Sequence, residues 1–332
     1  MRLVIDDYGA FLKKKGRRLV VVSGEKREEY ASDKVEQVLI LRGAALSIDA
    51  VELAIEKGID IVCLDRVGKP FARIYPCRLG GTTLTRRNQL MAQATPRGTA
   101  LAKAFVRAKL ENMGGFLKSL GKSRRNAALK EVAEKIMGFS ERIEGMRGSV
   151  EEVRNVLLGV EGEASKLYFS ALSEVLSPGL YSGTRSRRPP RDVFNAYLSY
   201  GYGVLYAEVE RACIISGLDP YLGFLHTDRY GKPSMALDLI EEFRQAIVDR
   251  TMVTLAARRR MGEGDVEKGE GVYLNKEGRA KAIEAVVKRF DTEVRHRGKR
   301  VALKDVILRQ AREVVRFLNG EKRIYSPYIH RW

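Results

Sequence analysis

The chain has few of the residues that build disulfide, zinc or membrane-spanning frameworks. Its 332 residues include three cysteines and three histidines. Cysteines so few and so irregularly spaced argue against a disulfide framework or a zinc site and favour a reducing compartment. No apolar run approaches the roughly 20 residues that span a membrane, and the first ten residues contain two aspartates and no signal-peptide core. We therefore expect a cytoplasmic protein that does not engage a membrane.

Nucleotide-binding and zinc-finger motifs are also missing. No G-x-x-x-x-G-K-[ST] loop occurs, so hydrolysis of nucleoside triphosphates at a P-loop has no support. The glycines at 201 and 203 lack the third glycine of a dinucleotide fingerprint and lie in a helical pattern. No Cys₂His₂ set is present for a finger.

Positive charge, in contrast, is abundant and unevenly placed. The chain carries 60 Lys and Arg against 42 Asp and Glu, a formal net charge of +18. Residues 1–85 hold 15 basic and 12 acidic side chains, and residues 86–332 hold 45 and 30. Such a surplus attracts polyanions because basic side chains on phosphates release counterions. Nucleic acid is the favoured partner, and a solvated surface or a hot habitat is the alternative.

The hydrophobic pattern predicts an α+β protein. Within residues 2–40, short β-rich runs at 3–5, 10–12, 18–22 and 35–40 are separated by turns, a helix is expected from Ser47 to about residue 57, and two strands follow at 59–64 and 71–75. Helical periods dominate from about residue 86. Long helices are expected over 149–176, with a Ser149–Glu152 capping box, and over 191–216, from 234 onward, 275–290 and 301–318. We predict a small β-rich domain over residues 1–85 and a larger all-helical domain over residues 86–332.

One of these helices carries a carboxylate where an apolar side chain would be expected. Glu161 falls within the apolar stripe of the 149–176 helix. A carboxylate on a packing face must be paired, protonated or bound to a metal ion, because an isolated buried charge is very costly. Gly159 and Gly162 flank it, and each glycine lowers the stability of a helix interior by about 1 kcal/mol. This cost indicates that another segment or a ligand approaches the helix closely here. A structural salt bridge to an arginine is the alternative.

A second candidate site combines a histidine with acidic residues. His226 precedes a helix that Ser234 could cap, and Asp238, Glu241 and Glu242 would then share one face of that helix. Like charges at this spacing repel, and a divalent cation would reverse the sign. One imidazole with several carboxylates suits Mg²⁺ or Mn²⁺ better than zinc. A solvated acidic face is the alternative.

Arginine-rich segments are candidate phosphate contacts. The four segments are 185–191, in a loop that contains proline and glycine, 258–260, 295–300 and the C-terminal tail at 322–332. The nucleic-acid-binding residues that we predict are Arg185, Arg187, Arg188, Arg191, Arg258 and Arg259.

Three motifs resemble those of the CRISPR-associated adaptation integrase, the metal-dependent DNA endonuclease subunit that inserts spacers into CRISPR arrays. They are GVEGEA at 159–164, GLDPYLGFLH at 217–226 and SMALDLIEEFR at 234–244, and NAYLSYGYGVL at 195–205 resembles the same family. The resemblance implies a metal site of Glu161, His226 and Glu241, with Asp238 at a further acidic position as a second ligand or a group that orients water. The ion would be Mg²⁺ or Mn²⁺.

The resemblance also implies a reaction and partners. The reaction is phosphoryl transfer, in which a 3′-hydroxyl of the captured fragment attacks a repeat phosphodiester, with cleavage of branched DNA when water attacks instead. The partners are double-stranded, branched or frayed DNA, a second copy of the chain held through the β-rich domains, and a small ferredoxin-like adaptation subunit. Two rivals remain, a non-catalytic nucleic-acid-binding scaffold and, given 14 tyrosines, a tyrosine recombinase.

Overall fold

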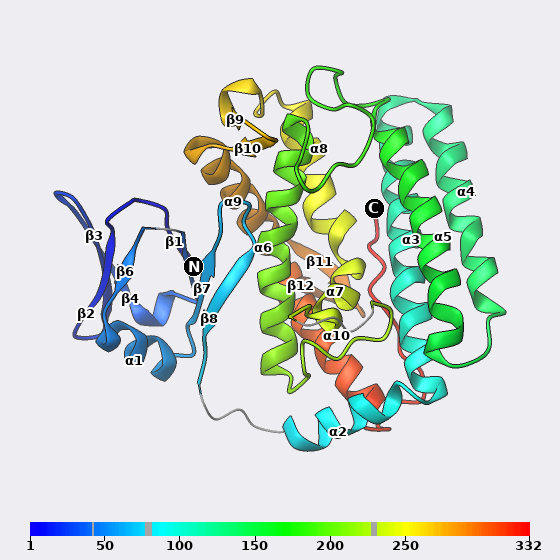
Figure 1. The fold of residues 1–332 in the computed structure, drawn as a ribbon, viewed down its shortest axis with the longest axis horizontal. Coiled ribbons are helices and arrows are strands. Elements are labelled where there is room, and N and C mark those ends of the chain that lie inside the picture. The colour runs from blue at the N-terminus through cyan, green and yellow to red at the C-terminus, as the bar shows by residue number, and fades with distance from the viewer. Residues whose placement is uncertain (42, 77–81, 227–230) are drawn as a thin grey trace.

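A strand-rich N-terminal part lies beside a larger helical part (Figure 1). The structure, a computed structural model, describes residues 1–41, 43–76, 82–226 and 231–332. Among the helices of these residues, none has the length and apolar character needed to cross a membrane.

Two four-stranded sheets form the N-terminal part. The first has the order β1-β5-β7-β8, with β1, β5 and β7 parallel and β8 antiparallel to β7. The second has the order β4-β3-β2-β6, in which β2, β3 and β4 form an antiparallel meander and β6 lies parallel to β2. The bounds are β1 (Arg2–Ile5), β2 (Phe11–Lys15), β3 (Arg18–Ser23), β4 (Lys26–Ala31), β5 (Gln37–Ile40), β6 (Ala45–Leu46), α1 (Ile48–Glu56), β7 (Asp60–Leu64) and β8 (Pro70–Ile74), with a 3₁₀ turn η1 (Ser32–Lys34).

The helical part surrounds one large apolar core. In Figure 1, α3, α4 and α5 stand side by side, and the C-terminal segment runs up next to α3. The bounds are α2 (Thr82–Ala92), α3 (Pro96–Arg124), α4 (Ala127–Glu144), α5 (Val150–Leu172), α6 (Val193–Ile215), α7 (Ser234–Leu239), η2 (Ile240–Glu242), η3 (Arg244–Asp249), α8 (Arg250–Ala257), η4 (Glu263–Asp265), β9 (Val266–Lys268), β10 (Val272–Leu274), α9 (Lys276–Phe290), β11 (Glu293–His296), β12 (Lys299–Ala302) and α10 (Leu303–Leu318).

Local capping explains several element ends that the sequence predicts. Ser47 accepts a hydrogen bond from the N–H of Ala50 and starts α1. Ser149 and Glu152 form the expected capping box at the start of α5. Each cap satisfies backbone N–H groups that have no partner inside the helix, so the helix boundary is set by adjacent residues alone.

Other expectations need correction. The part after residue 86 is not all helical, because β9 pairs with β10 and β11 with β12 in two short hairpins. The helix expected from Val301 begins at Leu303, because Val301 belongs to β12. The strand β4, whose sequence is KREEYA, was not predicted because its side chains are charged and partly exposed. The predicted boundary between residues 85 and 86 lies within α2 (Thr82–Ala92), and the division into domains 1–85 and 86–332 stays a prediction.

Close backbone contact and buried ion pairs fix the strand-rich part on α6. Arg2 lies 2.7 Å from Glu208 in a buried ion pair. The β7–β8 turn approaches α6 so closely that a Cβ at Gly203 would lie 2.2 Å from the carbonyl oxygen of Gly68. Glycine at position 203 is therefore needed for this packing.

Candidate active site

Two of the predicted acidic residues meet at a buried lysine. Glu161 comes from α5 and Glu241 from η2, and Lys109 reaches between them from α3. The Lys109 ammonium forms an ion pair with Glu161 Oε1 and lies 2.6 Å from Glu241 Oε2. Ser165, one turn along α5, donates its hydroxyl to the same Glu161 oxygen at 2.9 Å. The Glu161 side chain is 20% exposed, so this end of the cluster reaches solvent.

Nearby cations keep both glutamates ionised. Burial by itself raises the pKa of Glu241, yet that pKa is lowered to about 2 by the charges of neighbouring groups, of which Arg244 contributes most. Arg244 Nε donates to Glu241 Oε1 at 3.0 Å, on the oxygen that Lys109 leaves free. At Glu161 burial again raises the pKa, but the charge of Lys109 together with the hydrogen bonds from Lys109 and Ser165 outweighs it and lowers the pKa. Both carboxylates are anionic at neutral pH, as ligands of a cation must be.

Asp238 holds His226 in place. The Asp238 carboxylate is fully buried and lies 2.7 Å from His226 Nδ1. It also accepts the backbone N–H groups of Phe224, Leu225 and His226 at 2.5 to 2.9 Å. These four bonds occupy the carboxylate, which makes Asp238 a positioning residue in this structure. The hydrogen-bond network assigns the ring proton to Nδ1, which leaves Nε2 as the nitrogen that can bind an ion or carry a proton.

Asp238, Glu241 and Glu242, which were predicted to share one helix face, point in different directions. Ser234 is not the N-cap, because Pro233 occupies that position and no side chain caps the helix. The α-helix ends at Leu239 and continues as a 3₁₀ turn and then a π-helix, so the angular spacing of the side chains changes. As a result, Asp238 faces His226, and Glu241 faces Lys109.

Glu242 points away from His226 and from Lys109, and it anchors the C-terminal tail. Its carboxylate accepts the Tyr325 hydroxyl at 2.5 Å and the Tyr328 backbone N–H at 2.8 Å. Gln310 donates to it from α10 at 3.0 Å. Burial raises the pKa of Glu242 to about 7. Glu242 is therefore a structural carboxyl group that ties the tail to the element bearing Glu241.

The pair of glutamates fits a divalent cation. A positive charge, that of Lys109, already lies between the two carboxylates. Glu241 Oε2 is buried, and among the described residues Lys109, at 2.6 Å, is its one partner. Carboxylate oxygens suit Mg²⁺ and Mn²⁺. Within the described residues, no three His, Cys, Asp or Glu side chains lie close enough to hold one ion. The ligand set of Glu161, His226 and Glu241 stays a prediction.

A basic groove of about 700 Å³ adjoins the carboxylates through Arg244. The guanidinium of Arg244 lies over the ring of Tyr202, 4.6 Å from its centre. Tyr206 and Tyr273 also line the groove. Its cationic side chains come from four segments and are Lys69, Arg185, Arg187, Arg188, Lys232 and Arg244. Cations and aromatic rings in one groove are typical of surfaces that bind single-stranded nucleic acid.

The predicted arginines divide into three groups. Arg187 and Arg188 are exposed and line the groove. Arg185 lines it too, but its guanidinium binds Asn195 Oδ1 at 2.8 Å and Ser199 Oγ at 3.0 Å, and burial lowers its pKa to about 10. Arg185 therefore fixes the loop that carries its neighbours. The remaining three are exposed and lie outside the lining of this groove: Arg191, Arg258 and Arg259. Nucleic-acid binding by these six residues stays a prediction.

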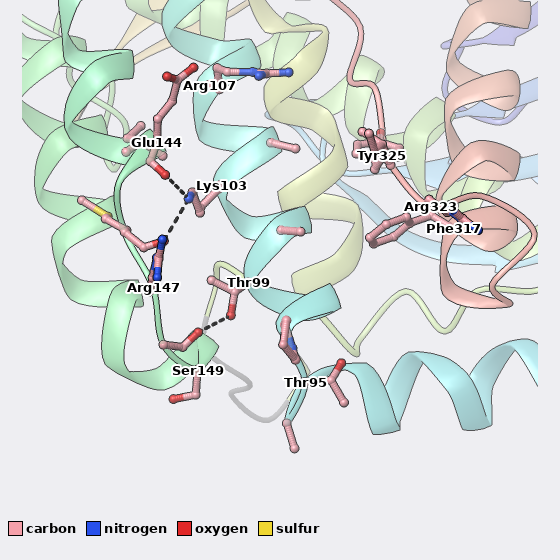
Figure 2. A pocket seen from close by; sticks show the side chains of 18 residues that line it. Thr95, Thr99, Lys103, Arg107, Glu144, Arg147, Ser149, Phe317, Arg323 and Tyr325 are labelled. Carbon is pink, nitrogen blue, oxygen red and sulfur yellow. Dashed lines mark hydrogen bonds between the residues drawn. The ribbon is translucent and has the colours of Figure 1, made fainter.

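A second cavity, of about 750 Å³, is separate from the carboxylates. It lies between the start of α3, the α4–α5 connection and the C-terminal tail (Figure 2). Lys103 in its wall donates to the carbonyl groups of Glu144 and Met146 at 2.7 and 2.9 Å and so closes the C-terminal end of α4. Neither Glu161 nor Glu241 lines this cavity.

Sequence reasoning found both glutamates but missed their partner. Lys109 lies in an apolar helical stretch, AFVRAKLEN, so the argument that singled out Glu161 applies equally to it. Gly159 and Gly162 were expected to meet another segment or a ligand, but a Cβ at either position would meet no atom of the described residues within 4 Å. The expectation of a neighbouring segment was therefore wrong for the described part of the chain, and a ligand there stays a prediction.

Comparisons with known proteins agree with the resemblance. The family model described as CRISPR associated protein Cas1 matches residues 3–288. The CRISPR-associated endonuclease Cas1 1 of Archaeoglobus fulgidus is 37% identical over 100% of both chains. The CRISPR-associated endonuclease Cas1 3 of Thermus thermophilus is 36% identical over 97% of this chain and 95% of its own.

The fold has solved counterparts. A casposase bound to an integration product is 24% identical and has a TM-score of 0.86 over 98% of this chain and 93% of its own. A Cas1 protein from Thermotoga maritima is 22% identical and has a TM-score of 0.82 over 98% and 99%. With full-length identity above 30% to curated endonucleases and a family match over most of its residues, the chain belongs to the Cas1 family of CRISPR-associated endonucleases.

Proposed function

We propose that this Cas1 chain joins captured DNA to a CRISPR repeat by phosphoryl transfer at the Glu161–Glu241 site. The oxygen of a DNA 3′-hydroxyl forms a bond to the phosphorus of a repeat phosphodiester, and the bond from that phosphorus to the outgoing 3′-oxygen breaks. The proton leaves the attacking hydroxyl, and the outgoing oxygen takes one up. When water attacks instead, the product is cleaved DNA, which gives nuclease activity on branched substrates. The anionic carboxylates beside a basic groove carry this proposal.

Each side chain of the site has its own role in the proposed reaction. Glu161 and Glu241 would hold Mg²⁺ or Mn²⁺, with His226 Nε2 as a third ligand or a proton carrier. When bound, the ion stabilises the negative charge that develops on the phosphate and lowers the pKa of an attacking hydroxyl or water. Asp238 keeps the His226 ring oriented. Arg244 links the site to the groove, where a phosphate can meet its guanidinium.

The groove is the proposed path of the DNA strand. Its exposed Arg187 and Arg188 are placed to contact phosphates, and Tyr206 and Tyr273 offer ring surfaces for unpaired bases. Phosphate contacts do not read base sequence, so this groove would hold DNA of many sequences. The casposase with the same fold is described on an integration product, which supports DNA as the partner.

We also propose a homodimer formed through residues 1–85, with a small ferredoxin-like subunit as a further partner. Large apolar side chains are exposed in the strand-rich part, among them Tyr8 at 93% and Ile48 at 79%. Exposed apolar surface of this kind is frequent at protein interfaces. Sedimentation of the chain and of an Ile48→Asp variant, with an exposed Glu163→Gln variant as control, would test the dimer.

The proposed activity is tested by one pair of isosteric variants on α5. Glu161→Gln removes a charge at the site, and Glu163→Gln removes one at an exposed position that pairs with Arg142. With branched DNA and Mn²⁺, we expect Glu161→Gln to abolish cleavage and strand transfer while Glu163→Gln retains both. DNA affinity should change by less than about tenfold in either, or ~1.4 kcal/mol.

The same assay separates the rival functions. EDTA should stop cleavage by a metal-dependent enzyme. If DNA binding is the only activity and EDTA changes nothing, the chain is a non-catalytic scaffold. If a covalent protein–DNA adduct forms in EDTA, a tyrosine nucleophile acts instead. Unimpaired strand transfer by Glu161→Gln would remove Glu161 from the mechanism.

A further inference from the structure

Lys109 is the one cation whose ion pairs bridge the two glutamates in the described residues. Its side chain is 6% exposed and arrives from α3, whereas the glutamates come from α5 and η2. An ammonium group in this position cross-links three elements of the helical part. Lysine on α3 thus meets the carboxylates that the proposed reaction requires.

Lys109 is shared between two carboxylates, each of which has one further polar partner. Glu241 Oε1 is held by Arg244, and Glu161 Oε1 by Ser165 as well as by Lys109. Glu241 Oε2, in contrast, has Lys109 as its one partner among the described residues, at 2.6 Å. Without that charge, two buried carboxylates would face each other. A cation between them is therefore required for both to stay ionised.

We infer that Lys109 is the site's own counter-ion, which holds the place of the divalent cation and is displaced when that cation binds. An ammonium group and a divalent cation repel each other strongly at a few ångströms, so they do not share the same oxygens. Lys109 thereby keeps the two carboxylates together before the ion binds, and competes with it for them. This inference rests on the proposed function, in which Glu161 and Glu241 bind the ion.

The first test is the affinity of the full-length protein for Mn²⁺ alone. Calorimetry at pH 7 would compare the wild type with Lys109→Gln and with Lys103→Gln, a control on the same helix whose ammonium binds only carbonyl groups. We expect Lys109→Gln to bind Mn²⁺ at least tenfold more tightly than the wild type, and Lys103→Gln to stay within twofold. Equal or weaker binding by Lys109→Gln would overturn the inference.

A second test uses the wild type, so that it does not depend on the folding of a variant. Amine acetylation followed by mass spectrometry reports how accessible each lysine is. We expect saturating Mn²⁺ to raise the labelling of Lys109 severalfold and to leave Lys103 unchanged. Labelling of Lys109 that does not respond to Mn²⁺ would refute displacement.

The two proposals fail in different ways. If the wild type binds no Mn²⁺ and Glu161→Gln changes nothing, the metal site itself is wrong. If the wild type binds Mn²⁺ and loses that binding in Glu161→Gln, while Lys109→Gln and the labelling show no effect, only the role of Lys109 is wrong.

Discussion

The ring nitrogen Nδ1 of His226 lies 2.7 Å from Asp238 Oδ1, and the same oxygen accepts the backbone N–H of His226 at 2.9 Å. One buried carboxylate thus fixes both the main chain and the side chain of a proposed catalytic histidine. A carboxylate that accepts the ring N–H of a histidine sets the tautomer and the orientation of the ring.

Asp238→Asn should weaken the activity without removing a proposed ligand. The amide lacks the negative charge and offers an NH₂ group to donors that need an acceptor, so we expect a loss of about 3 kcal/mol in stability. Cleavage should fall by about 10- to 100-fold. Long-range ¹H–¹⁵N NMR would show the His226 tautomer directly, because the chain has only three histidines. An unchanged tautomer with full activity would contradict the positioning role.

Glu242 should make the protein less stable as the pH rises. Burial raises the pKa of its carboxyl group from 4.5 to about 7, so the folded state binds the proton more tightly than the unfolded state. Its contribution to the free energy of unfolding is complete below pH 4.5 and is lost as the pH rises from there through 7. The total loss is at most about 3 kcal/mol. Urea unfolding at pH 5 and pH 8 should show a smaller difference for Glu242→Gln than for the wild type.

The exposed Glu163→Gln variant is the control for this pH effect, since it should keep the pH dependence of the wild type. Asp249, whose pKa burial raises to about 6, adds a second contribution of the same sign in all three proteins. Equal pH dependence in the wild type and Glu242→Gln would show that Glu242 does not titrate in this range.

Replacing Arg187 and Arg188 by alanine should weaken DNA binding evenly across sequences. Each lost phosphate contact lowers the salt dependence by roughly one unit in the slope of log K against log salt. Fluorescence anisotropy at several salt concentrations measures this slope. As a control for net charge, the pair Lys15 and Arg27 would be replaced in the strand-rich part, where both contact Glu29. If the two double variants behave alike, the effect is one of overall charge and the groove is not the DNA path.

Gly203→Ala should loosen the strand-rich part from α6. The added methyl group would lie 2.2 Å from a backbone oxygen of Gly68, so the β7–β8 turn must move, at a cost of about 1–3 kcal/mol. Gly138→Ala on α4 is the matched control, because its methyl group would meet no atom of the described residues within 4 Å, and its free energy of unfolding should rise by up to about 1 kcal/mol. Urea unfolding measures both, and equal stability of the two variants would contradict the close packing.

Much of the candidate site could be predicted from the sequence, because charged residues interrupt apolar patterns. Glu161 stood out within the stripe of α5, and its burial against Lys109 confirms that it needed a partner. The partner itself was missed, since periodicity within one helix says nothing about which other helix faces it. The divergence of Asp238 and Glu241 was missed for a related reason, because the change from α-helix to 3₁₀ turn and π-helix leaves no mark in the spacing of residues.

The sequence by itself determined where helices begin, as at Ser47 and Ser149, and which residue types could carry the chemistry. Caps act on backbone groups within three or four residues, so neighbours along the chain suffice to encode them. Tertiary structure alone decided that Lys109, Glu161 and Glu241 meet, and that Asp238 serves His226. Such contacts join segments more than fifty residues apart in the first case, and they exist only once the helices have packed and excluded water from between them.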